Sequence, residues 1–433
     1  MGNNGDENTL SAIGPQPLWV QRKHAVFAAS IGNVLEWYDF SVYVFFAPVI
    51  SRKFFPHTNP LSALMEALAV FGLGFIVRPL GALFFGKLAD RKGRKAALTL
   101  TIVLMAVGTL LIGLVPSFAV IGVIAPLALV GARLLQGFSA GGEWGGATTF
   151  LVEWSPSAQR GLYGSFNQVT VVVGMLLGSA GAALINTMLS PAASDLWGWR
   201  LAFILGGLLG PVGFYIRKHV GETPVFLRAQ EPVAPLGTAS NLARIACASG
   251  FTVLWTVSYY ILLDYMPVFL RTELHISRRA ALWSNSAGLL VLIVTMPLMG
   301  ALSDRIGRKP LLLSSCIAFA VLSYPLLRWM TSGVPLEAVV GVQILFALLI
   351  SMFSGPAPAA IAEIFPTRFR TTGVSVGYSL SVAIFGGFAP LMATLLIART
   401  GSPASPGYYL VAAAIVSTVT IALLPETANR RLQ

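Results

Sequence analysis

The chain has 433 residues, of which 55% are hydrophobic and only 11% are charged, and its mean hydropathy is +0.75. Ordinary soluble domains contain about 25% charged residues. A water-soluble core cannot hide this much apolar surface, so the composition predicts a protein embedded in a bilayer. The formal net charge of +12 does not indicate nucleic-acid binding, because the basic residues lie in short loops and form neither a stripe nor a basic helix.

The chain begins with a polar segment that has no apolar core or cleavage signature, so we expect residues 1–21 to be a disordered cytoplasmic tail rather than a signal peptide. Apolar windows long enough to cross the ~30 Å core of a bilayer follow in two sets of six. They fall at roughly 24–50, 64–86, 97–116, 120–146, 162–187 and 200–217, and then at 242–270, 280–301, 310–330, 336–361, 371–398 and 408–425.

The windows predict an all-α membrane protein with twelve transmembrane helices in two six-helix bundles, at 22–217 and 242–425. The long polar stretch between the two sets, 218–241, is expected to be a cytoplasmic linker. A short cytoplasmic tail, 426–433, follows the last window. Most Lys and Arg residues lie in segments on the side of the amino terminus, which places both termini in the cytoplasm.

A short charged loop occurs once in each half of the chain, at 86–95 and at 300–309. Gly, Leu, Asp, Arg, Gly, Arg and Lys recur in it at the same spacing. A second pair of segments, 153–160 and 363–370, shares Glu, Pro and Arg, and both members follow equivalent windows. Paired landmarks in one order indicate an internal repeat, so the two bundles are expected to be pseudo-symmetric.

The repeated loop resembles the hallmark loop of the major facilitator superfamily, and the run from Arg133 to Gly137 resembles a second motif of that superfamily. Within it the chain is similar to the metabolite:proton symporters over essentially its whole length. The segments that carry this similarity are 32–40, 78–81, 136–143, 197–200 and 222–223. The stretches 383–387 and 405–409 look most like citrate and tricarboxylate carriers.

This resemblance implies a monomeric secondary transporter of the bacterial cytoplasmic membrane. It would import a di- or tricarboxylate such as citrate or 2-oxoglutarate by proton symport and alternating access, without a cofactor or metal. Another metabolite, such as an aromatic carboxylate or the zwitterions proline and betaine, is the alternative. A membrane receptor or scaffold without transport is the alternative of another class, but it has no need for charges of both signs at mid-membrane.

Arg133 lies in the middle of the fourth window, where an ionised side chain costs at least about 2.5–3.5 kcal/mol unless it is paired. Its planar guanidinium suits a carboxylate, so we predict that it binds the substrate. The alternative is a permanent ion pair with Glu36 or Asp39. Arg78, inside the second window, either attracts anions or extends toward the cytoplasm.

Glu36 and Asp39 share one helix face in the first window. Two carboxyl groups in a low dielectric repel each other, which favours protonation of one of them, as a proton carrier requires. The alternative is that one carboxylate only neutralises Arg133. Asp264, in the seventh window before Pro267, is the rival for carrying the proton, and Pro267 is a possible gating break in the helix.

Further polar side chains inside the windows are candidates for substrate binding, although polar residues also hold helices together. They are Gln136, Asn167, Gln168, Tyr259 and Asn285. The charged loops are candidates for gates. We expect Asp90 and Asp304 to accept helix-start N–H groups of the opposite bundle, and Arg94 and Arg308 to reach Glu153 and Glu363 respectively. The alternative is that the loops only fix the topology.

Overall fold

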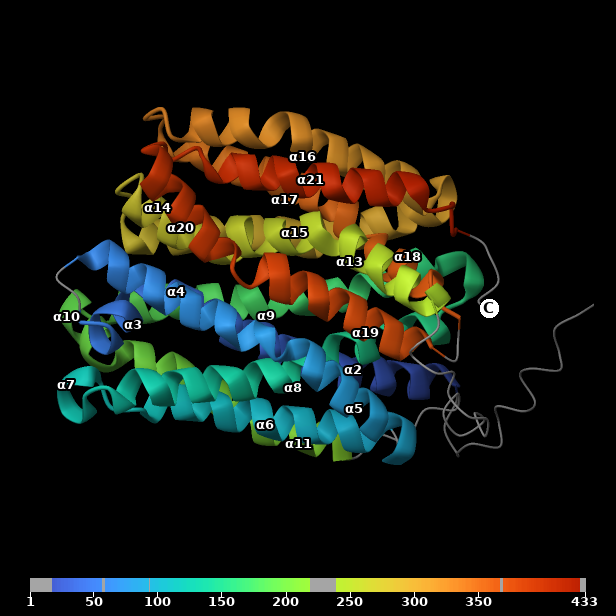
Figure 1. The fold of residues 1–433 in the computed structure, drawn as a ribbon, viewed down its shortest axis with the longest axis horizontal. Helices are drawn as coiled ribbons and strands as arrows, with labels where there is room; N and C mark the ends of the chain where they lie inside the picture. The colour runs from blue at the N-terminus through green and yellow to red at the C-terminus, as the bar shows by residue number, and fades with distance from the viewer. Residues whose placement is uncertain (1–17, 57–58, 93, 219–238, 367–368, 429–433) are drawn as a thin grey trace, which may run out of the picture.

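The computed structural model describes residues 18–56, 59–92, 94–218, 239–366 and 369–428, and the regular elements within these ranges are helices that run side by side (Figure 1). The first half consists of α2 (Leu18–Phe45), α3 (Ala47–Phe54), α4 (Pro60–Ile76), α5 (Arg78–Lys92), α6 (Arg94–Leu114), α7 (Phe118–Ile121), α8 (Ile124–Trp154), η2 (Ser157–Gln159), α9 (Arg160–Met188), α10 (Pro191–Ala193), η3 (Ser194–Gly198) and α11 (Trp199–Lys218). The second half consists of α13 (Ala239–Tyr259), η4 (Tyr260–Tyr265), α14 (Met266–Thr272), α15 (Arg278–Ile306), α16 (Arg308–Met330), α17 (Leu336–Ser354), α18 (Ala357–Glu363), α19 (Arg370–Ser381), η5 (Val382–Gly386), α20 (Ala389–Thr400) and α21 (Pro406–Leu423).

These helices confirm the predicted all-α membrane fold. Within the described ranges, 10 helices are long and apolar enough to cross a membrane, and the pair α2 and α3, bent by 64°, is an eleventh candidate. Thr99–Leu114 is a shorter apolar helix at the position of the third window. Each predicted window therefore corresponds to one helix or one broken helix.

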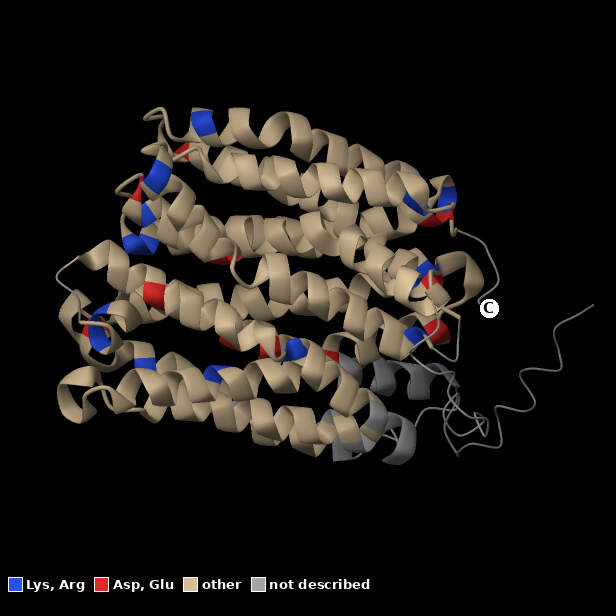
Figure 2. Ribbon diagram, viewed as in Figure 1, with Lys and Arg blue, Asp and Glu red and all other residues tan. Residues whose placement is uncertain are grey.

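The two halves of the chain form the two sides of the molecule (Figure 1). Helices of the first half, blue to green, occupy the lower part of the view, and those of the second half, yellow to red, occupy the upper part. Charged residues gather at the two ends of the helices, and few lie between them (Figure 2). Large apolar side chains face outward, for example Leu114 and Leu423, which are 62% and 80% exposed. Such an apolar outer surface suits contact with lipid.

Two helices of the second half are interrupted by π-helical segments, and each interruption precedes a proline. Pro267 follows η4, and Pro390 follows η5. Proline has no N–H to donate and its ring crowds the carbonyl four residues earlier, so the regular helical hydrogen bonding is lost there. Asp264 belongs to η4 and is fully buried, and π-helical turns occur frequently at functional sites.

Glycines allow the helices to approach one another closely. Added Cβ atoms at Gly137, Gly141 and Gly174 would collide with backbone atoms of neighbouring helices. Gly161 of α9 and Gly300 of α15 face each other in the same way across the boundary between the two halves. Gly181 has open space around it, so its small size is not needed for packing in this conformation.

Some predicted boundaries need correction. Helix α2 begins at Leu18, so the last residues of the predicted tail 1–21 are helical, because backbone hydrogen bonding and not hydropathy decides where a helix begins. Similarly, α13 begins at Ala239, inside the predicted linker 218–241. The rest of that linker, 219–238, lies outside the described residues, as do 1–17 and 429–433.

Candidate functional site

Five ionisable side chains are buried together at the centre of the molecule. Glu36 and Asp39 come from α2, Arg78 from the start of α5, Arg133 from α8 and Asp264 from η4. Each is at most 1% exposed. Charges at this depth require partners, because a bilayer core offers no water to solvate them.

Arg133 contacts Asp39 directly and through Gln136. Its Nη1 lies 3.8 Å from Asp39 Oδ2 and donates to Gln136 Oε1 over 2.7 Å. The Gln136 amide in turn donates to Asp39 Oδ2 and to Thr109 Oγ1. The sequence predicted Glu36 or Asp39 as the ion-pair partner of Arg133, and in the structure the partner is Asp39. At 3.8 Å this contact is looser than a bidentate guanidinium–carboxylate pair.

Aromatic rings surround the Arg133 guanidinium. The ring centres of Phe40, Tyr43 and Phe71 lie 5.1, 4.7 and 4.9 Å from its central carbon, and that of Phe75 lies 5.9 Å away. Ring faces attract cations electrostatically, more strongly where water is excluded. The rings thus help to hold a guanidinium that is only loosely paired.

Arg78 forms the tighter pair. Its Nη2 lies 2.8 Å from Glu36 Oε1, and both side chains are almost fully buried. The Arg78 guanidinium also lies 5.3 Å from the Tyr378 ring centre and 6.0 Å from that of Phe75. The Arg78 side chain does not extend toward the cytoplasm, so that interpretation of the sequence is wrong. The nearby carboxylate of Glu36 holds the guanidinium inside the molecule.

Asp264 connects the two halves at the same level. Its Oδ1 accepts a hydrogen bond from Ser41 Oγ of α2 over 2.6 Å, and its Oδ2 has no hydrogen-bond partner among the described residues. Beside this contact Trp37 stacks on Tyr260, with ring centres 5.6 Å apart, and Phe75 meets Tyr260 edge-on at 5.3 Å. Aromatic side chains from both halves therefore meet next to the charged cluster.

The other predicted substrate-binding residues have different surroundings. Asn167 is held inside the first half, accepting from Asn33 over 2.6 Å and donating to Thr148 over 2.7 Å. Tyr259 donates to Ser354 in the second half over 3.2 Å. Gln168 Nε2 and Asn285 Nδ2 are buried without a hydrogen-bond partner in the described part of the chain. Only Gln136 joins the charged cluster directly.

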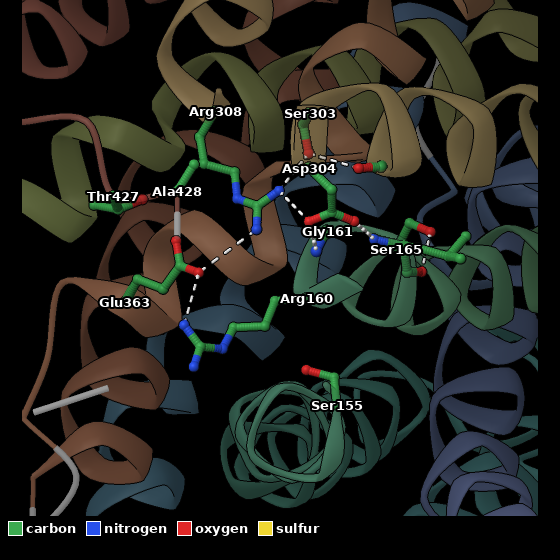
Figure 3. A network of polar contacts seen from close by, with 12 residues as sticks. Ser155, Arg160, Gly161, Ser165, Ser303, Asp304, Arg308, Glu363, Thr427 and Ala428 are labelled. Carbon is green, nitrogen blue, oxygen red and sulfur yellow. Dashed lines mark hydrogen bonds and ion pairs between the residues drawn. The ribbon is translucent and has the colours of Figure 1, made fainter. Parts of the chain in front are cut away.

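At one end of the molecule, Asp304 links the two halves (Figure 3). Its carboxylate accepts hydrogen bonds from the backbone N–H groups of Gly161 and Leu162, over 2.8 and 2.9 Å. These N–H groups belong to the first turn of α9, where helices leave donors unsatisfied and favour negative charge. Arg308 donates to the same carboxylate over 2.7 Å.

Glu363 adds to this contact. We call Asp304, Gly161, Leu162, Arg308, Glu363 and Arg160 the Asp304 cluster. Glu363 Oε1 lies 3.6 Å from Arg308 Nη2 and 3.8 Å from Arg160 Nη1 (Figure 3). Arg160 belongs to the first half and Glu363 to the second, so the cluster crosses the boundary twice.

Glu153 has a partner that the sequence did not predict. Arg370, at the start of α19, donates to Glu153 Oε1 over 2.9 Å. Arg370 comes from the opposite half, whereas Arg94 comes from the same half, and the contact between Arg94 and Glu153 stays a prediction. The side chains of Asp90 and Arg94 lie outside those that the structure describes.

A contact at the opposite end was not predicted. Asp195 accepts from Arg52 over 2.6 Å and from Arg278 over 3.0 Å, and Arg278 also donates to Asn186 over 2.7 Å. Arg278 begins α15 of the second half, and the other three residues belong to the first half. We call these four residues the Asp195 cluster. Their spacing in the sequence gave no sign of the pairing, because more than one loop separates each partner.

Comparisons with known proteins agree with this architecture. A family model described as "Sugar (and other) transporter" matches residues 25–234, and one described as "Major Facilitator Superfamily" matches residues 250–432. The chain is 35% identical over 426 residues to the proline/betaine transporter of Escherichia coli (strain K12), which covers 95% of this chain and 85% of the relative. It is also 35% identical over 410 residues to the citrate-proton symporter of Salmonella typhi, covering 92% and 93%.

Solved structures support the same fold. A proton:xylose symporter bound to 6-bromo-6-deoxy-D-glucose superposes with a TM-score of 0.78 at 17% identity, covering 94% of this chain and 97% of that one. A partially occluded, inward-open conformation of the xylose transporter from E. coli gives a TM-score of 0.76. At such low identity the likeness concerns the fold alone.

Proposed function

Since the chain belongs to the major facilitator superfamily and, within it, to the metabolite:proton symporters, we propose that it takes up a small metabolite bearing one carboxylate, which binds to Arg133. The broader role follows from the family: this is a multi-pass membrane transporter driven by protons, and not an enzyme. We further propose that it acts as a monomer in a bacterial cytoplasmic membrane, with both termini inside.

The balance of charges in the central cluster carries the proposal. Arg78 is engaged by Glu36 at 2.8 Å, whereas Arg133 meets Asp39 at 3.8 Å. Protonation of Asp39 would remove the charge that Arg133 faces and leave its guanidinium ready for one carboxylate of the substrate. Proton and substrate would then bind on one side, cross together and be released on the other side, which is the requirement for symport. Asp264, hydrogen-bonded to Ser41, remains the alternative proton carrier.

A zwitterion is the substrate class that this arrangement favours. One loosely paired guanidinium matches one carboxylate, and the ring faces of Trp37, Phe75 and Tyr260 suit a cationic ammonium group nearby. Proline and betaine have this chemistry, and a relative named as a proline/betaine transporter supports the assignment.

A tricarboxylate such as citrate is the second candidate, and the citrate-proton symporter relatives support it. The stretch 405–409, which favours citrate on sequence grounds, lies away from the central cluster. Tyr408 is 53% exposed and stacks on Tyr324, and Tyr409 donates to the Phe385 carbonyl. The tyrosines of this stretch are therefore weak support for citrate as the substrate. In addition, two of the three carboxylates of citrate would lack an arginine of their own.

Alternating access would use the two clusters that join the halves. We propose that the Asp304 cluster and the Glu153–Arg370 pair hold one end shut, and that the Asp195 cluster holds the other end shut. Rocking of the two halves would break one set while the other remains. The Asp90 and Arg94 side chains of the first loop are proposed to take part at the Asp304 end.

Uptake into proteoliposomes tests the proposal. With an imposed pH gradient, alkaline inside, we expect the wild type to accumulate labelled betaine or proline, and to lose accumulation when a protonophore collapses the gradient. Arg133→Gln is expected to weaken apparent affinity by about tenfold or more, because it removes a charged hydrogen-bond donor of the carboxylate. Arg399→Gln, at an exposed position, is the matched control.

Each part of the proposal can fail separately. Uptake that ignores the gradient excludes symport, and unchanged affinity in Arg133→Gln excludes carboxylate binding by Arg133. Accumulation of citrate without accumulation of betaine or proline selects the second candidate.

A further inference from the structure

A small cavity lies inside the first half, away from the boundary at which the two halves meet. Its wall is formed by α2, α6, α8 and α11, and it has a volume of about 20 Å³. A cavity needs a volume of roughly 10–15 Å³, together with polar groups on its wall, to hold a water molecule. The polar side chains of the wall are Glu36, Thr101, Thr109, Ser139 and Glu143. The cavity thus has the size and the lining for water.

Two buried carboxyl groups face this cavity. Glu36 belongs to the central cluster, whereas none of the contacts described above for that cluster or for the two clusters at the ends of the molecule involves Glu143. Glu143 is 3% exposed, and its Oε2 accepts from Thr101 Oγ1 over 2.8 Å. Ser139 Oγ donates to the Thr101 carbonyl over 2.6 Å, and this hydrogen bond holds α6 and α8 together at the cavity wall. An acid buried this deeply in a membrane span is costly and is generally retained for a function.

The cavity connects the proton-coupling acids with Glu143. Gln136 contacts Asp39 on one side and Thr109 on the other, and Thr109 lines the cavity. Glu143 lies about 10 Å beyond Gln136 along α8, toward the end where Glu153 meets Arg370. The ionisable side chains in the described wall are Glu36 and Glu143, and Glu36 is paired with Arg78.

We propose that Glu143 and this cavity form a proton relay that is separate from the substrate path. The proton leaves the Asp39 carboxyl for the Thr109 hydroxyl, which passes its own proton to a water molecule in the cavity, and that water passes a proton to the Glu143 carboxylate. One O–H bond forms for each one that breaks, and no other bond changes. Substrate moves between the two halves while the proton moves within the first half toward the Asp304 end. This inference rests on the proposed symport.

The relay can be tested by measuring exchange and accumulation separately. Betaine counterflow at equal pH on both sides needs no net proton movement, whereas accumulation under a pH gradient requires it. Glu143→Gln keeps the size of the side chain and an oxygen acceptor for Thr101. We expect counterflow within about twofold of the wild type and gradient-driven accumulation lowered by about tenfold or more, because a positioned proton acceptor is lost. Glu337→Gln, at an exposed carboxyl of α17, should change neither.

Three outcomes would separate the possibilities. Wild-type protein that exchanges betaine but ignores the gradient contradicts the proposed symport itself. Wild-type protein that responds to the gradient, with Glu143→Gln responding equally, overturns the relay alone. If Glu143→Gln loses counterflow as well, Glu143→Asp decides: a relay predicts restored counterflow with accumulation that has a shifted pH dependence, whereas a structural role predicts that counterflow and accumulation recover or fall together.

Discussion

Arg78 and Arg133 differ in how tightly each is paired, and this difference distinguishes their roles. The 2.8 Å contact between Arg78 and Glu36 pairs the two opposite charges directly. Arg133 has a longer contact with Asp39, a hydrogen bond to Gln136 and a surround of ring faces. Breaking a tight buried pair leaves an uncompensated charge, whereas a looser one exchanges partners more readily. Arg133 is therefore the better candidate for binding an anion transiently.

Asp39→Asn tests coupling at this residue. The substitution mimics a permanently protonated carboxyl and leaves Arg133 without a negative partner. We expect betaine counterflow to persist and pH-gradient-driven accumulation to fall by about tenfold or more, since the coupled proton is no longer released. Loss of counterflow and accumulation to the same extent would count against coupling through Asp39. Glu273→Gln, outside the cluster, is the control.

Glu426 stabilises the start of α16 and gives a pH-dependent contribution. Partial burial raises the pKa of Glu426, but hydrogen bonds from four backbone N–H groups, including those of Arg308 and Lys309, lower it to a net value below its ordinary 4.5. The contribution to stability is thus complete above about pH 4.5 and is lost as the pH falls below it.

Glu426→Ala is expected to reduce the unfolding free energy by about 1 kcal/mol at pH 7, as the loss of a helix cap does. Thermal unfolding in detergent at pH 7 and below pH 4 measures this, and the difference between the variant and the wild type should shrink at the lower pH. Glu337→Ala is the control. A difference that grows on acidification contradicts the assignment.

Among the described elements, α9 and α15 make the most extensive contact between the halves. A Cβ atom at Gly300 would lie 2.5 Å from the Gly161 carbonyl and 2.9 Å from Ser165 Cβ. The same two helices carry the hydrogen bonds from Gly161 and Leu162 to Asp304. Close packing and the charged contact therefore depend on each other at this end.

Gly300→Ala should push these helices apart and destabilise the described conformation by about 1–3 kcal/mol, the usual cost of overpacking. Gly341→Ala, where an added Cβ has open space, is the matched control and should be close to neutral. Thermal unfolding of both variants checks the difference, and equal stabilities would show that the contact can relax at no cost.

At the scale of the whole molecule, the two halves are joined at both ends and in the middle. The Asp304 cluster and the Asp195 cluster occupy opposite ends, and the Ser41–Asp264 hydrogen bond lies between them. A transporter that opens to one side at a time has to break one terminal cluster and keep the other. Weakening the Asp304 cluster should therefore raise the population of the state that is open at that end. Weakening the Asp195 cluster should raise the population of the state that is open at the other end.

Asp304→Asn and Arg278→Gln test this shift. Spin labels on Gln159→Cys with Arg305→Cys report the Asp304 end, and labels on Ala192→Cys with Arg279→Cys report the Asp195 end. We expect Asp304→Asn to lengthen the first distance and Arg278→Gln to lengthen the second, because each removes a charge-assisted contact between the halves. If both variants open the same end, the clusters are not opposing gates.

The sequence by itself determined the twelve spans, the repeat and the presence of Arg133 with acids at mid-membrane, because hydropathy and spacing are local properties of the chain. Only the tertiary structure decided which acid meets which arginine, that Asn167 bonds inside the first half, that Glu153 meets Arg370, and that Arg278 meets Asp195. Likewise, only the tertiary structure shows that Glu143 lines a cavity. Such pairings depend on the rotation and packing of helices that are far apart in the chain, and no local pattern records these.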